Sequence, residues 1–157
     1  MRSLSHLLLS ICMIAAIGCS EDFTPVPYTY TKVFSGENNK TWKITLFEET
    51  LDGKVVDKFM PSCLTDDRYV FYANSDHSYQ ALSGSRKCFT DEPDATNDRW
   101  SFTNATATLI MVLPIFSDSA IPFIVRKADT DKMELEIFFD DTNTGSYRIH
   151  FDAIDEE

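Results

Sequence analysis

The sequence predicts an all-β protein, an antiparallel up-and-down barrel of about eight to nine strands. Short segments in which apolar and polar residues alternate recur along the chain from residue 41 onward. Turn-forming residues separate these segments at short intervals, which favours sequential hairpins. No segment of this region has the apolar periodicity of a full-length amphipathic helix. The alternation also predicts that one face of the sheet is dry and the other wet.

The strands are expected at nine places, in chain order 41–49, 54–60, 67–73, 78–84, 99–103, 108–116, 121–127, 132–140 and 146–154. In the first strand, Trp42, Ile44 and Leu46 fall on one face because side chains alternate along a strand. Asp52-Gly53 predicts a tight turn into the second strand.

The second half of the chain continues the pattern. Segment 108–116 is almost entirely apolar, as a strand covered on both faces would be. Segments 85–98 and 117–120 are expected to be loops. The last two strands alternate cleanly, and their inward residues are expected to be Met133, Leu135, Ile137, Phe139, Tyr147, Ile149 and Phe151.

The N-terminus fits a secretory signal peptide over residues 1–18, because Arg2 precedes an apolar core too short to span a membrane. A small residue, Gly18, leads directly into Cys19. This order is typical of a bacterial lipoprotein, which is cut before the cysteine and lipidated on its sulfur. Several lipid chains on one residue anchor a protein firmly. The alternative is an ordinary secreted protein cut near Gly18.

The chain is therefore expected to have three regions. Residues 1–18 form the signal peptide, residues 19–35 a lipidated N-terminus and flexible tether, and residues 36–157 the barrel domain. The tether contains prolines and lacks apolar periodicity. A short helical turn is expected within residues 32–40.

The location follows from the residues after the cysteine. Ser20-Glu21-Asp22 resembles the acidic export signal of Bacteroidota lipoproteins, which directs them to the outer face of the outer membrane. We therefore expect a surface-exposed lipid anchor in the outer membrane, with a periplasm-facing anchor as second choice. The formal net charge of −11 makes nucleic acid an unsuitable partner, because an acidic surface repels phosphates. No protein partner is identified.

The third and fourth strands predict a disulfide. Residues 74–77 form a turn between them, because Asn, Asp and Ser hydrogen-bond to the local backbone. A hairpin closed by this turn places Tyr72 opposite Tyr79 and Cys63 opposite Cys88. Exported proteins retain disulfides, so these two cysteines are expected to be bonded.

Motifs for catalysis are missing from the sequence. It has no Gly-rich phosphate loop, no Gly-x-Ser-x-Gly and no His-Glu-x-x-His. His77 falls in a predicted turn and His150 on an outward strand face, and both are expected to be solvated. We therefore expect no enzymatic activity, no metal and no cofactor.

Aromatic residues are the remaining clue, with 12 Phe, 6 Tyr and 2 Trp in the chain. An eight-stranded barrel is either filled by side chains or encloses one small ligand. The inward residues taken as ligand-binding candidates are Trp42, Trp100, Phe102, Met133, Leu135, Ile137 and Phe139. The alternative is that they simply form the core. In the hairpin, two sets compete for the inward face, namely Tyr69, Phe71 and Leu82 against Val70, Tyr72, Tyr79 and Ala81.

A resemblance to a known family adds to this interpretation. Trp42 on the first strand, Cys63 before an aromatic strand, Cys88 after it and Trp100-Ser101-Phe102 further on resemble lipocalin-like domains of Bacteroidota lipoproteins. The resemblance covers roughly residues 40–154 and implies a barrel with a small apolar ligand. The chain departs from true lipocalins at Lys40, where their signature has glycine. Lipocalins also place an arginine over this tryptophan, but alternation puts Arg148 on the wet face.

One modification is also expected. Asp118-Ser119-Ala120 matches the Asp-Ser-apolar pattern of Bacteroidota O-glycosylation, which makes Ser119 a glycosylation candidate. Taken together, the residues predict an outer-membrane-anchored lipoprotein whose barrel binds a small hydrophobic or glycan-derived ligand at the cell surface. The alternative is a non-enzymatic protein–protein interaction module that uses loops such as 85–98 and 117–120.

Overall fold

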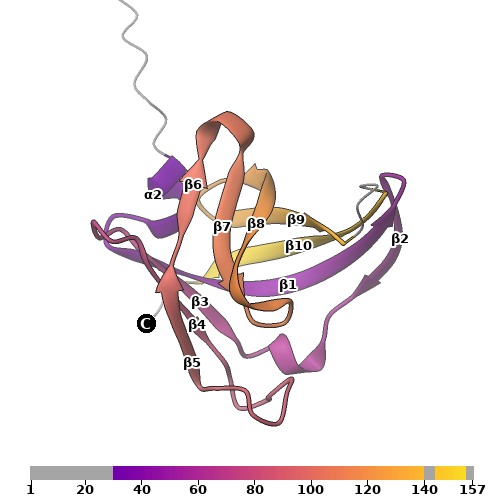
Figure 1. Cartoon of the computed structure of the whole chain (residues 1–157), viewed down its shortest axis with the longest axis horizontal. Coiled ribbons are helices and arrows are strands. Elements are labelled where there is room, and N and C mark those ends of the chain that lie inside the picture. Colours follow the sequence, from indigo (N-terminus) through magenta and orange to yellow (C-terminus); the bar gives the residue numbers. More distant parts are fainter. Residues whose placement is uncertain (1–29, 140–143, 155–157) are drawn as a thin grey trace, which may run out of the picture.

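The structure, a computed structural model, describes residues 30–139 and 144–154. The signal peptide and Cys19 lie outside these residues. Ten strands form one antiparallel sheet, and nine of them curl into a nearly closed barrel (Figure 1). The predicted all-β antiparallel barrel is therefore confirmed. None of the described helices has both the length and the apolar character needed to cross a membrane.

In chain order the helices and strands are α2 (Tyr30–Ser35), β1 (Asn39–Leu51), β2 (Lys54–Phe59), the 3-10 turn η1 (Ser62–Leu64), β3 (Arg68–Tyr72), β4 (Ser78–Leu82), β5 (Ala95–Arg99), β6 (Ser101–Thr103), the 3-10 turn η2 (Asn104–Thr106), β7 (Thr108–Leu113), β8 (Ser117–Ala128), β9 (Lys132–Phe138) and β10 (Gly145–Ile154). Their order across the sheet is β5-β4-β3-β1-β10-β9-β8-β7-β6, with β2 paired to β1 outside this path. Because only Trp100 separates β5 from β6 in the chain, the two ends of the path meet there.

Strand β1 organises the sheet because it pairs along its length with the last strand, β10. On its other edge, β1 pairs first with β3 from Asn39 to Trp42 and then with β2 from Phe47 to Leu51. A register shift between Ile44 and Leu46 interrupts the alternation. The expectation that Leu46 faces inward is therefore wrong. Beyond the irregularity Phe47 is the buried residue, with 2% of its surface exposed.

Helix α2 closes one end of the barrel. Its Phe34 is buried, and the Trp42 indole N–H donates a 2.8 Å hydrogen bond to the Phe34 carbonyl. The Nζ of Lys40 lies 5.1 Å from the centroid of the Trp42 ring. The packed helix falls inside the predicted tether, so the folded domain includes residues before 36, namely Tyr30–Ser35. The segment Tyr30–Ser35 is mostly polar, but it packs against the barrel because the large apolar side chain of Phe34 is buried there.

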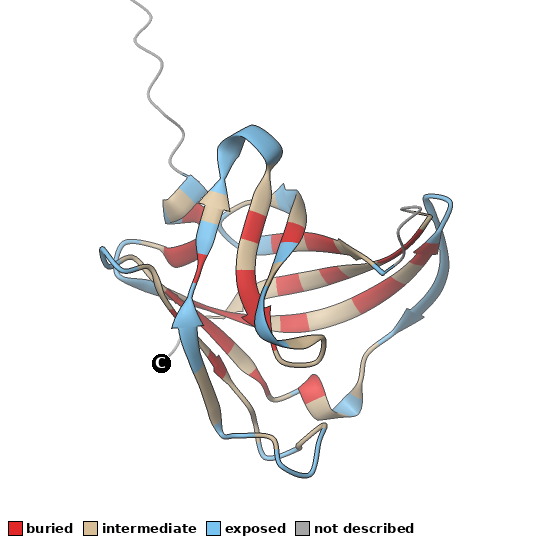
Figure 2. Ribbon diagram, viewed as in Figure 1, coloured by how far each residue is buried: buried red, intermediate tan, exposed pale blue. Residues whose placement is uncertain are grey.

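The barrel interior is filled by large side chains, shown as the buried bands of Figure 2. Trp42, Trp100, Tyr69, Phe71 and Tyr79 are all almost fully buried. Phe71 meets both Tyr79 and Trp100 in edge-to-face contacts, with ring centroids 5.0 and 5.6 Å apart. In the β3–β4 hairpin, two alternative sets of residues were candidates for the inward face, and neither is right as a whole. Tyr69 and Phe71 from one set are buried together with Tyr79 from the other.

The β3–β4 hairpin forms as predicted, but with a different register. Phe71 pairs with Tyr79 and Tyr69 with Ala81, one residue away from the predicted register. The turn gains a residue because His77 adopts a positive φ of 49°, and Asn74 closes the turn through hydrogen bonds to Ser78. His77 is not simply solvated, since its ring stacks on Trp100 at 4.8 Å.

The predicted disulfide is confirmed, with the Cys63 and Cys88 sulfurs bonded and their Cα atoms 5.1 Å apart. The pairing survives the change of register because both cysteines lie beyond the open end of the hairpin, where the strands no longer pair.

Two predicted loops differ in the structure. Residues 117–120 begin the long strand β8, and the turn lies at 114–116 instead. Pro114 ends β7 because proline has no N–H for the ladder. The polar segment 85–98 ends in strand β5, whose exposed Asn97, Asp98 and Arg99 face solvent and so lack the apolar alternation of a strand.

Candidate ligand-binding site at the open end of the barrel

The end of the barrel opposite α2 is open. Strand β1 runs from the α2 end to its hairpin with β2 at the far side of the molecule (Figure 1). The β4–β5 loop and the β7–β8 turn lie at this open end. Two hollows occur here, and Ile115 and Phe116 of the β7–β8 turn line both of them.

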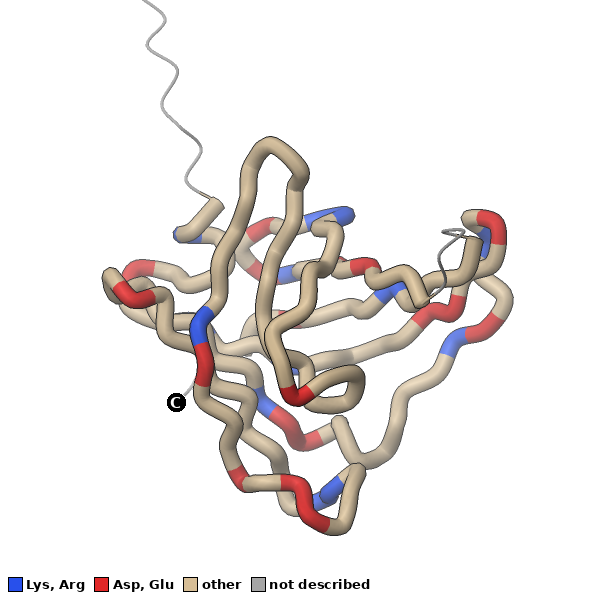
Figure 3. Tube along the Cα trace, viewed as in Figure 1, with Lys and Arg blue, Asp and Glu red and all other residues tan. Residues whose placement is uncertain are grey.

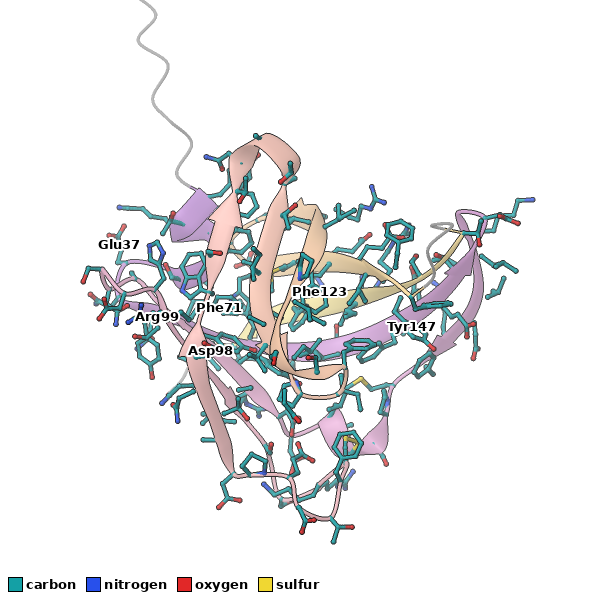
Figure 4. The ribbon with its side chains drawn as sticks, in the orientation of Figure 1. Glu37, Phe71, Asp98, Arg99, Phe123 and Tyr147 are labelled. Atoms are coloured by element: carbon teal, nitrogen blue, oxygen red, sulfur yellow. A yellow bond between two sulfur atoms is a disulfide. The ribbon has the colours of Figure 1, made fainter. Side chains whose placement is uncertain are left out.

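The first hollow, which we call the aromatic hollow, has a volume of about 300 Å³. Its lining residues are Phe47, Phe59, Pro61, Ile115, Phe116 and Tyr147. The rings form a connected cluster. Phe47 stacks on Phe59 at 5.5 Å, and Tyr147 lies 6.1 Å from Phe59 and 5.8 Å from Phe116. Figure 4 shows Tyr147 among rings near the β1–β2 hairpin, while Phe123 and Phe71 lie deeper in the barrel.

The second hollow, which we call the lateral cleft, has a volume of about 360 Å³. It is lined by Phe89, Asp91, Glu92, Pro93, Thr96, Pro114, Ile115, Phe116, Ser117 and Asp118. In the part of the chain that the structure describes, no backbone hydrogen-bond pairing joins β5 to β7. These two strands therefore separate from each other on the side of Trp100 that faces the open end. The cleft lies between the loops at the wide end of this divergence. Figure 3 shows acidic positions along the β4–β5 loop and at the start of β8.

A polar network holds the β4–β5 loop that forms one wall of the lateral cleft. The Glu92 carboxylate accepts hydrogen bonds from the Ser83 hydroxyl at 2.8 Å and from the Cys88 N–H at 2.6 Å. Burial acts to raise the pKa of Glu92, but these hydrogen bonds outweigh it and leave the pKa lowered. The network and the disulfide therefore hold the cleft wall in one arrangement.

The acidic pair before β3 fixes the start of the same loop. Asp67 accepts a 2.8 Å hydrogen bond from the Gly84 N–H, and Asp66 accepts two from Ser85. Burial raises the pKa of Asp67, whereas hydrogen bonding to Ser85 lowers that of Asp66. The pair is thus occupied in holding the loop. Among residues 30–139 and 144–154, no group of three or more His, Cys, Asp or Glu side chains is placed to hold a metal ion.

The seven predicted ligand-binding candidates lie in different places. Trp42, Trp100, Met133 and Leu135 are buried in the packed interior and do not line the aromatic hollow. Phe102 packs against Phe34 at the α2 end, with ring centroids 5.1 Å apart. Ile137 is half-buried, and Phe139 is 53% exposed with its ring 5.0 Å from Tyr147. Two of the seven therefore lie beside a ring of the aromatic hollow, since Phe139 contacts Tyr147 and Ile137 is the residue paired with Tyr147 on the neighbouring strand.

None of the four rings that line the aromatic hollow is among the seven predicted ligand-binding candidates. Simple alternation from Trp42 puts Phe47 on the opposite face, and the register shift between Ile44 and Leu46, which has no clear signal in the sequence, brings it inward. Phe59 and Phe116 stand at strand ends, where alternation no longer indicates direction. Tyr147 was expected to face inward, and its aromatic contacts agree with that expectation.

The glycosylation candidate Ser119 lies exposed in the first residues of β8, where its backbone N–H donates a 3.0 Å hydrogen bond to the Ser117 hydroxyl. It is next to Asp118 of the lateral cleft and is accessible from solvent.

A row of charged side chains crosses the outer face of the barrel, which the sequence reasoning had treated as plain solvated surface. Lys58, Glu48, Arg148 and Glu136 occupy directly paired positions on β2, β1, β10 and β9. The Lys58 Nζ lies 2.5 Å from Glu48, and the Arg148 Nε lies 3.1 Å from Glu134. Arg148 is on the outer face, so it does not pack over Trp42.

His150 belongs to the same outer row. Its Nε2 lies 3.4 Å from Glu48 and its Nδ1 3.9 Å from Glu134. Glu136 is buried and pairs with Arg126, and its other oxygen accepts a 2.6 Å hydrogen bond from the Ser146 hydroxyl. Opposite charges placed across paired strands stabilise the sheet. The row is therefore explained by sheet pairing.

Comparison of the chain with models of known protein families, with curated proteins and with solved structures finds no match.

Proposed function

We propose that the chain is a lipoprotein anchored in the outer membrane through Cys19, and that its barrel binds a small apolar ligand at the open end. The ligand-binding part of this proposal rests on the aromatic hollow. Ligand pockets are usually concave, mostly apolar and roughly 300–1,000 Å³ in volume, and the hollow lies at the small end of this range at about 300 Å³.

The lining chemistry favours an apolar ligand over a glycan. Tyr147 provides the only side-chain polar group among the six residues that line the aromatic hollow. A sugar buried there would lose hydrogen bonds to water without replacing them, which is costly. An apolar group has no hydrogen bonds to water to lose, and it gains contact with the rings of Phe59, Phe116 and Tyr147.

The open hollow also favours ligand binding over a purely structural role. Phe59 is 37% exposed although it packs on Phe47 and Tyr147. Large aromatic rings that gather at an open end without being covered are typical of binding surfaces. The role we propose is binding rather than catalysis.

Titration with the neutral fluorescent probe N-phenyl-1-naphthylamine tests this function. All buried core residues lie between Val33 and Phe151, so a chain from residue 20 onward carries the complete described barrel without its lipid. We expect saturable binding that Phe59→Ala weakens about two- to tenfold, since a ring contact contributes about 0.5–1.5 kcal/mol. Val56→Ala is the matched control, because Val56 is exposed outside the hollow. Equal binding by both variants would refute the proposed site.

A second candidate function rests on strand β2. All six of its residues are exposed, and among the described strands it pairs with β1 alone. Leu51, Val55 and Val56 expose 52, 41 and 57% of their surface at this hairpin. Unpaired edges with apolar side chains are templates for pairing with another chain. This favours a protein-interaction role, which Val56→Lys would abolish while leaving binding of the naphthylamine probe unchanged.

A further inference from the structure

The aromatic hollow and the lateral cleft meet at one turn. Ile115 and Phe116 line both, so the two hollows adjoin at the β7–β8 turn. The Phe116 ring also contacts Phe47, at 6.2 Å, and Phe123, at 6.5 Å. The two hollows therefore form adjoining parts of one surface at the open end.

Their chemistry is opposite. No charged residue lines the aromatic hollow, whereas Asp91, Glu92 and Asp118 line the lateral cleft without a basic residue among its lining. Within residues 30–139 and 144–154, no ion pair joins Asp91 or Asp118 to a basic side chain. Lys87 of the same loop is paired with Asp94 at 2.9 Å, and its charge also contributes to the lowered pKa of Glu92. Asp91 and Asp118 are therefore the two lining carboxylates whose negative charge no ion pair within the described residues compensates.

The cleft is also partly apolar. Phe89 is 52% exposed there, and Pro93 and Pro114 line it. The Glu92 carboxylate is held by the Cys88 and Phe89 N–H groups, so one negative charge stays fixed beside the Phe89 ring. A cation with apolar substituents meets both features at once, because aromatic rings and carboxylates each attract cations.

We propose that the ligand is a cationic amphiphile, with its apolar body in the aromatic hollow and its positively charged group in the lateral cleft. This inference rests on the proposed function and specifies the class of ligand. The aromatic hollow provides affinity for the apolar body, and the acidic cleft selects the charge of the head group. A neutral ligand of the same shape binds more weakly, and an anionic one is repelled.

Calorimetric titration with two matched probes tests the proposal on the chain from residue 20 onward. The probes are decyltrimethylammonium and decyldimethylamine oxide at pH 8, both below their micelle-forming concentrations. They share the apolar chain and a similar head-group size but differ in net charge. We expect the cation to bind about three- to tenfold more tightly, since each exposed ion pair contributes about 0.2–1 kcal/mol. Added salt should reduce the difference.

Three variants separate the two claims. Asp118→Asn combined with Asp91→Asn should bring the cation to the affinity of the amine oxide and leave the amine oxide unchanged. Asp76→Asn makes the same kind of charge change on the exposed β3–β4 turn at the α2 end, and should alter neither probe. Phe59→Ala should weaken both probes alike.

The outcomes are distinguishable. If neither probe binds, the proposed function fails together with this inference. If both probes bind equally and the Asp91 and Asp118 substitutions change nothing, the ligand class is wrong while the apolar site stands. If the Asp76 control lowers cation binding as much as the cleft variants, the effect is one of total charge and the inference is overturned.

Discussion

Glu48 illustrates how one residue joins several strands of this barrel. It lies buried on the outer face of β1, with Lys58 on one side and Arg148 and His150 on the other. The hydrogen bond from Lys58 lowers the pKa of Glu48, burial opposes this shift, and His150 adds to the lowering. The charged form of Glu48 is therefore favoured in the folded protein.

This lowered pKa predicts how stability depends on pH. Because the folded-state pKa lies below the ordinary value of 4.5, the stabilisation is complete above pH 4.5 and is lost as pH falls through the folded pKa. Glu48→Gln should therefore be less stable than wild type at pH 7, and the difference should shrink toward zero in strong acid. Urea unfolding at several pH values measures this difference.

The control for that series is Glu37→Gln, since Glu37 pairs with Lys32 at 2.8 Å but keeps 80% of its side chain exposed. Exposed ion pairs contribute little, so the control should match wild type at every pH. A difference between Glu48→Gln and wild type that stayed constant down to pH 2 would contradict the assignment.

Gly84 is required at its position for a steric reason. A Cβ at this residue would lie 2.1 Å from the Asp66 Cγ, whose carboxylate holds Ser85. We expect Gly84→Ala to destabilise the fold by about 1–3 kcal/mol, as overpacking does. Adding Asp66→Ala removes the clash, so the double variant should be no less stable than Asp66→Ala alone. Additive losses in a double-mutant cycle would show that the clash is not the cause.

At the scale of elements, sequence patterns predicted the strands better than their details. Alternation in 132–140 placed Met133 and Leu135 correctly in the core, because nothing interrupts the pleat of β9. It failed at Phe47, where β1 shifts register, and in the β3–β4 hairpin, where the positive φ of His77 lengthens the turn. Both errors come from single irregular residues, and one such residue reverses every face beyond it.

The candidate site was harder to predict than the core. The aromatic hollow combines Phe59 of β2, Phe116 of the β7–β8 turn and Tyr147 of β10, which only the closed barrel brings together. Alternation identifies residues that face a sheet's dry side, and these proved to fill the interior. Residues at strand ends carry no such pattern, so the open end could not be assembled from the sequence.

The Cys63–Cys88 disulfide joins the segment before β3 to the β4–β5 loop, across a separation of 25 residues. In the chain-entropy model, a loop of this size stabilises the fold by about 3.5 kcal/mol. Reduction of the disulfide, or Cys63→Ser with Cys88→Ser, should lower the free energy of unfolding by roughly this amount. Denaturation with and without reductant measures it, and a loss below about 1 kcal/mol would contradict the expectation.

At the scale of the whole molecule, the two ends of the barrel have different roles. Helix α2 is the first described element after the proposed lipid anchor, and it closes the end where Trp42 and Trp100 are buried. The aromatic hollow lies at the other end of β1, which spans about 40 Å if extended. An anchored molecule should therefore present its open end away from the membrane.

Depth measurements on the lipidated protein in vesicles check this orientation. A fluorophore attached at Glu37→Cys, beside α2, should be quenched by lipid-bound quenchers more strongly than one at Asp52→Cys, in the β1–β2 turn. Equal quenching at both positions, or the reverse order, would contradict the proposed orientation.

The most direct test of the central claim is a crystal structure of the chain from residue 20 onward with decyldimethylamine oxide bound. The account predicts that the alkyl chain lies between the rings of Phe59, Phe116 and Tyr147, at the hollow of about 300 Å³. Alkyl density inside the barrel among Trp42 and Leu135, or an aromatic hollow closed by collapse of Phe59 onto Phe116 with no ligand present, would contradict it.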